Sequence, residues 1–282
     1  MPAPDVTAII PTLDSAAHLA RCLASLDAQR DVDVEVVIVD QGSRDGTPDV
    51  ARIHGARVLS IPRPAFYRPP TRSRNLGARA ATGRLLAHLD ADMELPPGLL
   101  AAAAARCERK GVAAVVLHER DVSEGFWGAV KALEREAYVG VAPVEGARLV
   151  RADVFRAVGG YDEELGSGED WDVHARYQQH GVIEAAPESL AHHTGRVSFT
   201  AQVRKKFAYG RSARKYLQKH DGRPVLSAML SAYWGSRRAF ARHPVLALGF
   251  LVLRATEVGA VAAGMIYQSA RDRGRWRKWS PT

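Results

Sequence analysis

The sequence predicts an α/β fold, with a mainly parallel central sheet flanked by helices and a helical C-terminal extension that is both basic and apolar. Short apolar runs alternate with helical patterns in the first third of the chain, as in βαβ units that build a parallel sheet. Acidic residues follow directly after two of the most apolar runs. Near residue 195 the composition changes, and arginine and lysine become dominant.

The N-terminal part contains the clearest strand and helix signals. Its predicted strands are β-branched apolar runs, and its predicted helices carry leucine or alanine at helical spacing. In chain order we predict a strand at 6–10, a helix at 18–29, a strand at 34–39, a helix from 47, a strand at 57–61, a helix at 73–81 and a strand at 84–89. Turn residues at 42–46 and a proline-rich loop at 62–70 separate them.

The middle of the chain continues the alternation less regularly. We predict an alanine-rich helix at 99–110, a strand at 112–117, helices at 126–138, 152–158 and 169–180, and a short strand after the last helix. The loop 159–168 is rich in glycine and acidic residues. We place the end of the catalytic domain at residue 195, so that residues 1–195 form one domain and residues 196–282 an extension.

The net charge of +8 is unevenly distributed along the 282 residues. Residues 1–195 hold 21 Lys and Arg against 28 Asp and Glu, a charge of −7, and residues 196–282 hold 18 against 3, a charge of +15. Such a basic segment suits anionic lipid headgroups or nucleic acid, although a solvated basic face is an alternative. The two cysteines, Cys22 and Cys107, lie in predicted helices and suggest a reducing compartment, and no secretion signal is recognisable at the N-terminus.

The segment 244–266 is long and apolar enough to cross a bilayer, but Arg254 and Glu257 stand at its centre. Charges at that depth cost about 2.5–3.5 kcal/mol each, which disfavours a single span. Spaced three residues apart on a helix, the two side chains can pair with one another. We therefore prefer peripheral membrane attachment through 204–282, with a hairpin packed on the catalytic domain or across a homodimer as the alternative.

The most informative motif for chemistry is Asp90-Ala91-Asp92, at the carboxyl end of an apolar strand. Open α/β sheets bind ligands outside those strand ends, and two carboxylates there can hold a divalent cation that bridges nucleotide phosphates. Asp40 also follows a buried strand, and Pro11 and Thr12 close the first strand of the same sheet. Three strand ends therefore converge on one crevice.

Four stretches, in order, resemble the motifs of family 2 glycosyltransferases with the Rossmann-like GT-A fold. They are AIIPTLDSAAHLARCLASL, VEVVIVDQGSRDGT, RSRNLGARAATGRLLAHLDADM and GGYDEELGSGEDWDVHARYQQHG, and they cover most of residues 6–181. The resemblance implies that Pro11, Thr12 and Asp40 contact the nucleoside, that Asp90 lies near the ribose or donor sugar, and that Asp92 coordinates the metal. Arg74 is expected close to the nucleotide or its diphosphate, with pairing to a nearby acid as the alternative.

The pair Glu169-Asp170 resembles the acidic motif that supplies the family's catalytic base. Asp170 is the predicted base, which accepts the proton of the acceptor hydroxyl, and Glu169 is expected to orient the site or the acceptor. A single displacement with one base implies inversion at the anomeric carbon. His193, from the pattern HHTGRVS, is the histidine that we expect to add to the metal site, although a histidine without a ligand role is the more common case.

The sequence thus predicts a metal-dependent inverting glycosyltransferase, with Mn²⁺ or Mg²⁺, a nucleoside-diphosphate sugar donor and a hydroxyl acceptor that is a glycan, a lipid-linked molecule or a small molecule. We expect no nucleic-acid partner, and a cytoplasmic location at the inner face of the membrane. The main alternative is a catalytically silent protein on a transferase fold that binds membrane or nucleic acid. A sugar-1-phosphate nucleotidyltransferase is disfavoured because Pro11-Thr12-Leu13-Asp14 replaces the basic glycine-rich loop of that class.

Overall fold

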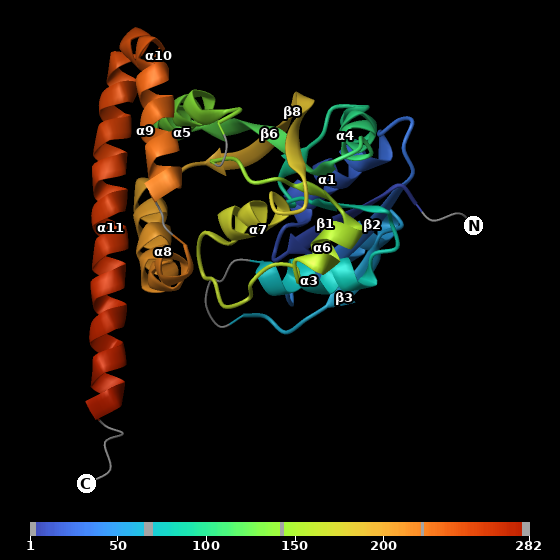
Figure 1. Ribbon diagram of the computed structural model, residues 1–282, viewed down its shortest axis with the longest axis horizontal. Helices are drawn as coiled ribbons and strands as arrows, with labels where there is room; N and C mark the ends of the chain where they lie inside the picture. Colours follow the sequence, from blue (N-terminus) through green and yellow to red (C-terminus); the bar gives the residue numbers. More distant parts are fainter. Residues whose placement is uncertain (1–3, 65–69, 142–143, 221–222, 278–282) are drawn as a thin grey trace.

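The computed structural model describes residues 4–64, 70–141, 144–220 and 223–277 (Figure 1). A single eight-stranded sheet is formed by strands between residues 6 and 196, in the order β3-β2-β1-β4-β7-β6-β8-β5. Helices flank this sheet, and a group of C-terminal helices stands along one side of the domain (Figure 1). The predicted loop at 62–70 includes residues 65–69, which lie outside the described residues.

The N-terminal half of the sheet is parallel, as predicted, because β1 pairs with both β2 and β4, and β2 pairs with β3. The elements here are β1 (Val6–Thr12), α1 (Ala16–Asp27), β2 (Val34–Asp40), α2 (Thr47–Ile53), β3 (Arg57–Ser60), α3 (Thr71–Ala80) and β4 (Leu85–His88). Strands β1 and β4 are buried along their whole length, which explains their unbroken apolar sequences. All four strands end at the same edge of the sheet.

The second half of the sheet is mixed. Its elements are β5 (Met93–Glu94), α4 (Leu99–Cys107), β6 (Val112–Glu124), α5 (Gly125–Tyr138), β7 (Leu149–Arg151), α6 (Ala152–Ala157), α7 (Glu169–Tyr177) and β8 (Val182–Arg196). Strand β7 runs antiparallel to β4 and β6, and β5 runs antiparallel to β8. The sequence pattern missed the two short strands, and it underestimated β6 and β8, whose outer halves are polar and exposed.

The C-terminal extension is helical, as the pattern indicated. It consists of α8 (Phe199–Lys219), α9 (Arg223–Gly235), α10 (Arg237–Arg242) and α11 (Pro244–Arg277). Helix α11 lies against α8 and α5. The approach of α11 to α8 is close, because a Cβ atom at Gly264 would lie only 2.2 Å from the Phe207 carbonyl oxygen. A glycine at this position is therefore a requirement of the packing.

The charges at the centre of α11 point into the protein. Arg254 forms an ion pair of 2.9 Å with Glu257, the predicted three-residue spacing, and a second ion pair with Glu134 of α5. Tyr233 of α9 donates a hydrogen bond to the same Glu134 carboxylate at 2.8 Å. The side chains of Glu134 and Glu257 are almost completely buried. Packing against α5 thus satisfies the two charges that would be costly in lipid.

The outward positions of α11 carry no charge from Pro244 to Ala270. These exposed residues are Val245, Leu248, Leu251, Val252, Ala255, Val258, Gly259, Ala262, Ala263, Ile266, Tyr267 and Ala270. Among the described residues, Pro244–Asp272 is the one helix long and apolar enough to span a membrane, judged only by length and composition. We call this set of exposed residues the outer face of α11.

Candidate active site

The first part of the candidate site lies where β1 and β2 end together. Thr12 and Asp40 are register partners, and the Thr12 hydroxyl donates a hydrogen bond of 3.0 Å to Asp40 Oδ1. The other carboxylate oxygen of Asp40 accepts from the backbone N–H groups of Gly42 and Ser43, at 3.1 and 3.0 Å. Asp40 is thus a fixed acceptor beside Pro11 and Thr12 at the carboxyl edge of the sheet.

Arg74 joins two carboxylates from distant parts of the chain. From α3 its guanidinium donates to Asp90 Oδ1 at 2.8 Å and to Asp170 Oδ1 at 3.0 Å. It also lies 5.3 Å from the centre of the Tyr161 ring, and only 3% of its side chain is exposed. Arg74 thus pairs with acids, the alternative that the sequence left open beside a contact with the nucleotide.

A second arginine extends the charged network toward Asp92. Arg148 contacts Asp90 Oδ2 at 3.2 Å and Glu119 Oε1 at 2.6 Å. Glu119 in turn contacts His192 Nδ1 at 2.9 Å, and His192 Nε2 lies 3.2 Å from Asp92 Oδ1. The network therefore runs unbroken from Asp170 through Asp90 to Asp92.

The charges in this network shift the pKa values of the residues that form it. Burial alone would raise the pKa of Asp90, but the Arg148 and Arg74 guanidinium groups lower it to about 2. Burial likewise opposes the charged form of His192, yet hydrogen bonds to Asp92 and Glu119 raise its pKa to about 10. Asp90 is therefore ionised and His192 protonated at neutral pH.

His192 and His193 follow one another on β8, so their side chains point to opposite sides of the strand. His192 meets Asp92, whereas His193 Nε2 lies 2.7 Å from Glu94 Oε2. The sequence analysis selected His193 for the metal site; in the structure His192 is the histidine that faces Asp92, and His193 faces Glu94. Alternation along β8 is the physical reason, and its register could not be fixed from the sequence.

Asp92 and His192 are the residues of this network that could contribute to a metal site. Among the described residues, no group of three or more His, Cys, Asp or Glu side chains is arranged to hold a metal. Asp92 and His192 nevertheless face one another within one cation's reach, and about a third of the Asp92 side chain is exposed. Magnesium and similar ions commonly take one or two protein ligands and complete their shell with substrate phosphates and water.

The acidic pair Glu169-Asp170 begins α7, after a glycine in the left-handed conformation. Gly168 has a φ of 76°, and Glu169, Asp170 and Asp172 occupy the first turn of the helix. Burial, followed by the nearby Asp170 charge, raises the pKa of Glu169 to about 7. Glu169 and Asp170 thus differ in environment, since Asp170 pairs with Arg74 and has 44% of its side chain exposed.

The glycine-rich loop before α7 is held by α3. The Asn75 amide nitrogen donates to the Tyr161 carbonyl at 2.9 Å, and the Tyr161 N–H donates back to Asn75 Oδ1 at 2.9 Å. A Cβ at Gly160 would lie 2.7 Å from that Oδ1, and the φ of Gly160 is 72°. Neighbouring residues Arg74 and Asn75 therefore position, respectively, the acid Asp170 and the loop that leads to it.

The structure brings the sequence-selected residues to one edge of the sheet: Pro11, Thr12 and Asp40 from β1 and β2, Asp90 and Asp92 after β4, Arg74 from α3, and Glu169 and Asp170 from α7. Sequence reasoning missed two residues that connect the site, Arg148 just before β7 and Glu119 in β6. Neither lies in a motif, and a buried arginine before a short strand gives no periodic signal. Only the fold identifies them.

Comparison with known proteins gives the family. The model of glycosyl transferase family 2 matches residues 7–152. The pre-mycofactocin glycosyltransferase of Mycobacterium tuberculosis is 28% identical over 231 residues, which is 77% of this chain and 48% of that protein. The succinoglycan biosynthesis protein ExoA of Rhizobium meliloti is 26% identical over 240 residues, or 79% of this chain and 73% of that one. This chain thus spans about half the length of the mycobacterial relative.

Solved structures agree on the fold. The mannosyltransferase PcManGT from Pyrobaculum calidifontis, in complex with GDP-Man and Mn²⁺, superimposes with a TM-score of 0.61 at 19% identity, over 95% of this chain and 88% of that one. Residues 1–349 of TarS from S. aureus give a TM-score of 0.57 at 15% identity, over 96% and 92%. The family match and these likenesses lead to one conclusion: the chain belongs to glycosyl transferase family 2 and has the GT-A fold.

Proposed function

We propose that the protein is an inverting glycosyltransferase that moves a sugar from a nucleoside diphosphate to a hydroxyl acceptor. The observation that most supports this proposal is the charged network of the site. It links Asp170 to Asp90 through Arg74. It then links Asp90 to Asp92 through Arg148, Glu119 and His192. It assembles, at the carboxyl edge of a GT-A sheet, an exposed carboxylate, cationic groups and a candidate metal ligand. These are the groups needed to accept a proton and to stabilise a departing diphosphate.

In the proposed reaction the donor nucleoside lies against Pro11, Thr12 and Asp40. Asp170 accepts the proton of the acceptor hydroxyl while that oxygen attacks the anomeric carbon. The bond from the anomeric carbon to the diphosphate breaks on the opposite side, so the sugar inverts. Arg74, which contacts both Asp90 and Asp170, aligns the donor end of the site with the base.

We further propose Mn²⁺ or Mg²⁺ as cofactor, held by Asp92 and His192 together with the diphosphate oxygens. Such a cation would neutralise the charge that develops on the leaving diphosphate. His192 would have to lose its proton to hold the metal, because hydrogen bonds to Asp92 and Glu119 raise its pKa to about 10. The likeness to a mannosyltransferase solved with GDP-Man and Mn²⁺ supports, for this chain, a nucleotide-sugar donor and a divalent ion.

We also propose that the enzyme works at a membrane surface, through the outer face of α11. That face is continuous and uncharged, while the charges of the same helix are satisfied inside the protein. Exposed arginines lie at both ends of this face. Arg238 and Arg242 precede α11, and Arg271 comes after its apolar stretch. An apolar face bounded by basic residues suits shallow insertion among anionic headgroups at the cytoplasmic side.

The proposed activity is tested by supplying UDP-, GDP- and dTDP-sugars with Mn²⁺ or Mg²⁺ and measuring nucleoside diphosphate release and thermal stabilisation. A bound donor should raise the melting temperature by mass action. Asp170→Asn should retain donor binding and lose transfer by about 10²–10⁴-fold. Wild-type turnover in that variant would exclude Asp170 as the base, and no stabilisation by any donor would exclude the proposed donor class.

A further inference from the structure

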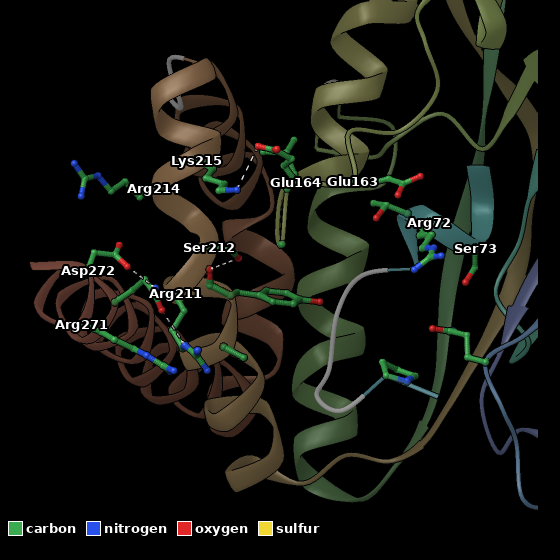
Figure 2. Close-up of a pocket in the computed structure, with 18 of the residues that line it drawn as sticks. Arg72, Ser73, Glu163, Glu164, Arg211, Ser212, Arg214, Lys215, Arg271 and Asp272 are labelled. Carbon is green, nitrogen blue, oxygen red and sulfur yellow. Dashed lines mark hydrogen bonds and ion pairs between the residues drawn. The ribbon is translucent and has the colours of Figure 1, made fainter. Parts of the chain in front are cut away.

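A large cleft lies between the catalytic domain and the C-terminal helices, with a volume of about 1130 Å³. One wall consists of residues that follow β2 and β3 and of the first turn of α3. The other consists of residues 163–166 and of helices α8 and α11. Figure 2 shows Arg211 and Lys215 from α8 and Arg271 from α11 across the cleft from Arg72 and Ser73.

The lining of this cleft is strongly basic. Its six cations are Arg63, Arg72, Arg211, Arg214, Lys215 and Arg271, and its three carboxylates are Glu163, Glu164 and Asp272, so its formal charge is +3. Two cations are already paired, Arg63 with Asp14 at 2.5 Å and Lys215 with Glu164 at 3.3 Å.

The positive charge that remains comes from several elements. Arg211 forms a hydrogen bond of 3.4 Å with the neutral Gln268 and lies over the Tyr267 ring, and it has no ion-pair partner among the described residues. Arg72, Arg214 and Arg271 have no ion-pair partner within the part of the chain that the structure describes. Guanidinium groups from α3, α8 and α11 therefore surround one cavity that also holds three carboxylates but keeps an excess of positive charge, an arrangement that suits a ligand with several anionic oxygens.

The cleft adjoins the proposed base on both walls. Residues 163–166 lead directly to Glu169 and Asp170, and they pack on α8 so closely that a Cβ at Gly166 would lie 2.5 Å from the Ser212 side chain. On the opposite wall, Ser73 precedes Arg74, which holds Asp170. The cleft is therefore lined by segments next to those that carry Arg74 and Asp170, although Asp170 itself does not line it.

The cleft is distinct from the residues assigned to the donor. Thr12, Asp40, Asp90 and Asp92 do not line it, although Gln41, next to Asp40, does. The cavity thus meets the donor residues at one point and extends away from them toward α8 and α11. This placement corresponds to the acceptor side of the reaction.

We propose that this cleft binds the anionic part of the acceptor, a phosphate or diphosphate ester, with Arg211 and Arg271 as its main contacts. The inference rests on the proposed transferase function and names the acceptor class. A lipid phosphate and a water-soluble sugar phosphate share this chemistry. Arg271 ends the outer face of α11, so an acceptor with an apolar chain could place its phosphate in the cleft and its chain along that face.

The test measures binding of octyl phosphate and of glucose 1-phosphate to the full chain by calorimetry, in metal-free buffer with EDTA. The double variant Arg211→Gln/Arg271→Gln should bind the preferred probe about tenfold more weakly or worse, because two charge-assisted hydrogen bonds are lost. The double variant to lysine should recover part of the affinity, which separates charge loss from misfolding. Arg21→Gln, an exposed arginine of α1, is the matched control and should bind as the wild type does.

Asp92→Asn separates this proposal from the proposed donor site, because it should leave probe binding unchanged. Loss of binding in Asp92→Asn, with retention in the glutamine double variant, would place the anion at the donor diphosphate site and overturn the inference. So would the absence of binding of both probes to the wild type at millimolar concentration. Tighter binding of octyl phosphate identifies a lipid source, and tighter binding of glucose 1-phosphate identifies a soluble one.

Discussion

Arg74 Nη1 lies 3.0 Å from Asp170 Oδ1, an ion pair that joins the start of α3 to the start of α7 across 96 residues of sequence. The same guanidinium contacts Asp90, so one buried arginine balances two carboxylates from different elements. A buried charge that loses its partner is strongly destabilising, because the partner remains without compensation. Arg74 is therefore the residue on which both the charge balance and the alignment of the site depend.

Arg74→Ala is expected to lower the free energy of unfolding by about 1.5–3 kcal/mol, the range for lost hydrogen bonds to charged groups, because Asp90 keeps Arg148 as a partner and Asp170 is partly exposed. The loss should be largest above pH 4, because the pKa of Asp90 in the folded protein is held near 2 and its charge contributes stability only where it is ionised. Urea unfolding at pH 7 and pH 3 measures the effect. Arg79→Ala, an exposed arginine of the same helix, should change stability by less than about 0.5 kcal/mol. Equal effects of the two substitutions would contradict the role given to Arg74.

For Glu169 we predict the opposite dependence of stability on pH. Its pKa is raised to about 7 in the folded protein, from the ordinary value of 4.5, so the folded state binds more protons between these values. The stability of the wild type should therefore decrease as pH rises from about 4.5 to 7 through this group. Glu169→Gln should remove that decrease. The melting temperature of the variant, compared with that of the wild type, should therefore be higher at pH 8 than at pH 5.

Thermal melts followed by circular dichroism at pH 5 and pH 8 provide the measurement. Glu188→Gln, at an exposed position of β8, is the control and should follow the wild type at both values. A Glu169→Gln variant with the same pH dependence as the wild type would show that Glu169 is ionised at pH 5. An activity profile that rises near pH 7 and disappears in Glu169→Gln would assign the proton acceptor to Glu169 in place of Asp170.

The parallel half of the fold was predictable because its strands are continuous apolar runs that end in polar motifs. Asp40 and Asp90 follow buried strands directly, so their common edge could be derived from the sequence. Strand β7 could not be found, because it has three residues and its pairing with β4 and β6 is set by tertiary contacts. The polar halves of β6 and β8 carry no apolar pattern, and they are strands because they pair with one another.

The site was predictable only where a motif carried it. Arg148 lies just before β7, and Glu119 lies in β6. The pairing of β6 with β8 is interrupted by irregularities, including one between Val116 and His118. A one-residue change of register moves every side chain to the other face of a strand. The choice between His192 and His193 was open in the sequence for this reason.

The two histidines allow a matched test of the metal site. His192→Gln should raise the Mn²⁺ concentration needed for half-maximal activity by about 10–100-fold, whereas His193→Gln should change it little. The positions are adjacent on β8 and are similarly buried, so the pair controls for damage to the strand. Titration of activity with Mn²⁺ gives the answer. A larger increase in the Mn²⁺ requirement for His193→Gln than for His192→Gln would assign the metal role to His193.

The outer face of α11 makes the membrane proposal testable without disturbing the fold. Leu251 and Val258 are 61% and 65% exposed, so the double substitution Leu251→Asp/Val258→Asp removes no core packing. In contact with lipid, two carboxylates at these positions should weaken binding to vesicles of phosphatidylglycerol and phosphatidylcholine by more than about tenfold. Ile53→Asp, 83% exposed on α2, should sediment with vesicles as the wild type does. Unchanged sedimentation of the double variant would reject a lipid contact, and loss of a wild-type dimer on gel filtration would assign the face to a second copy of the chain.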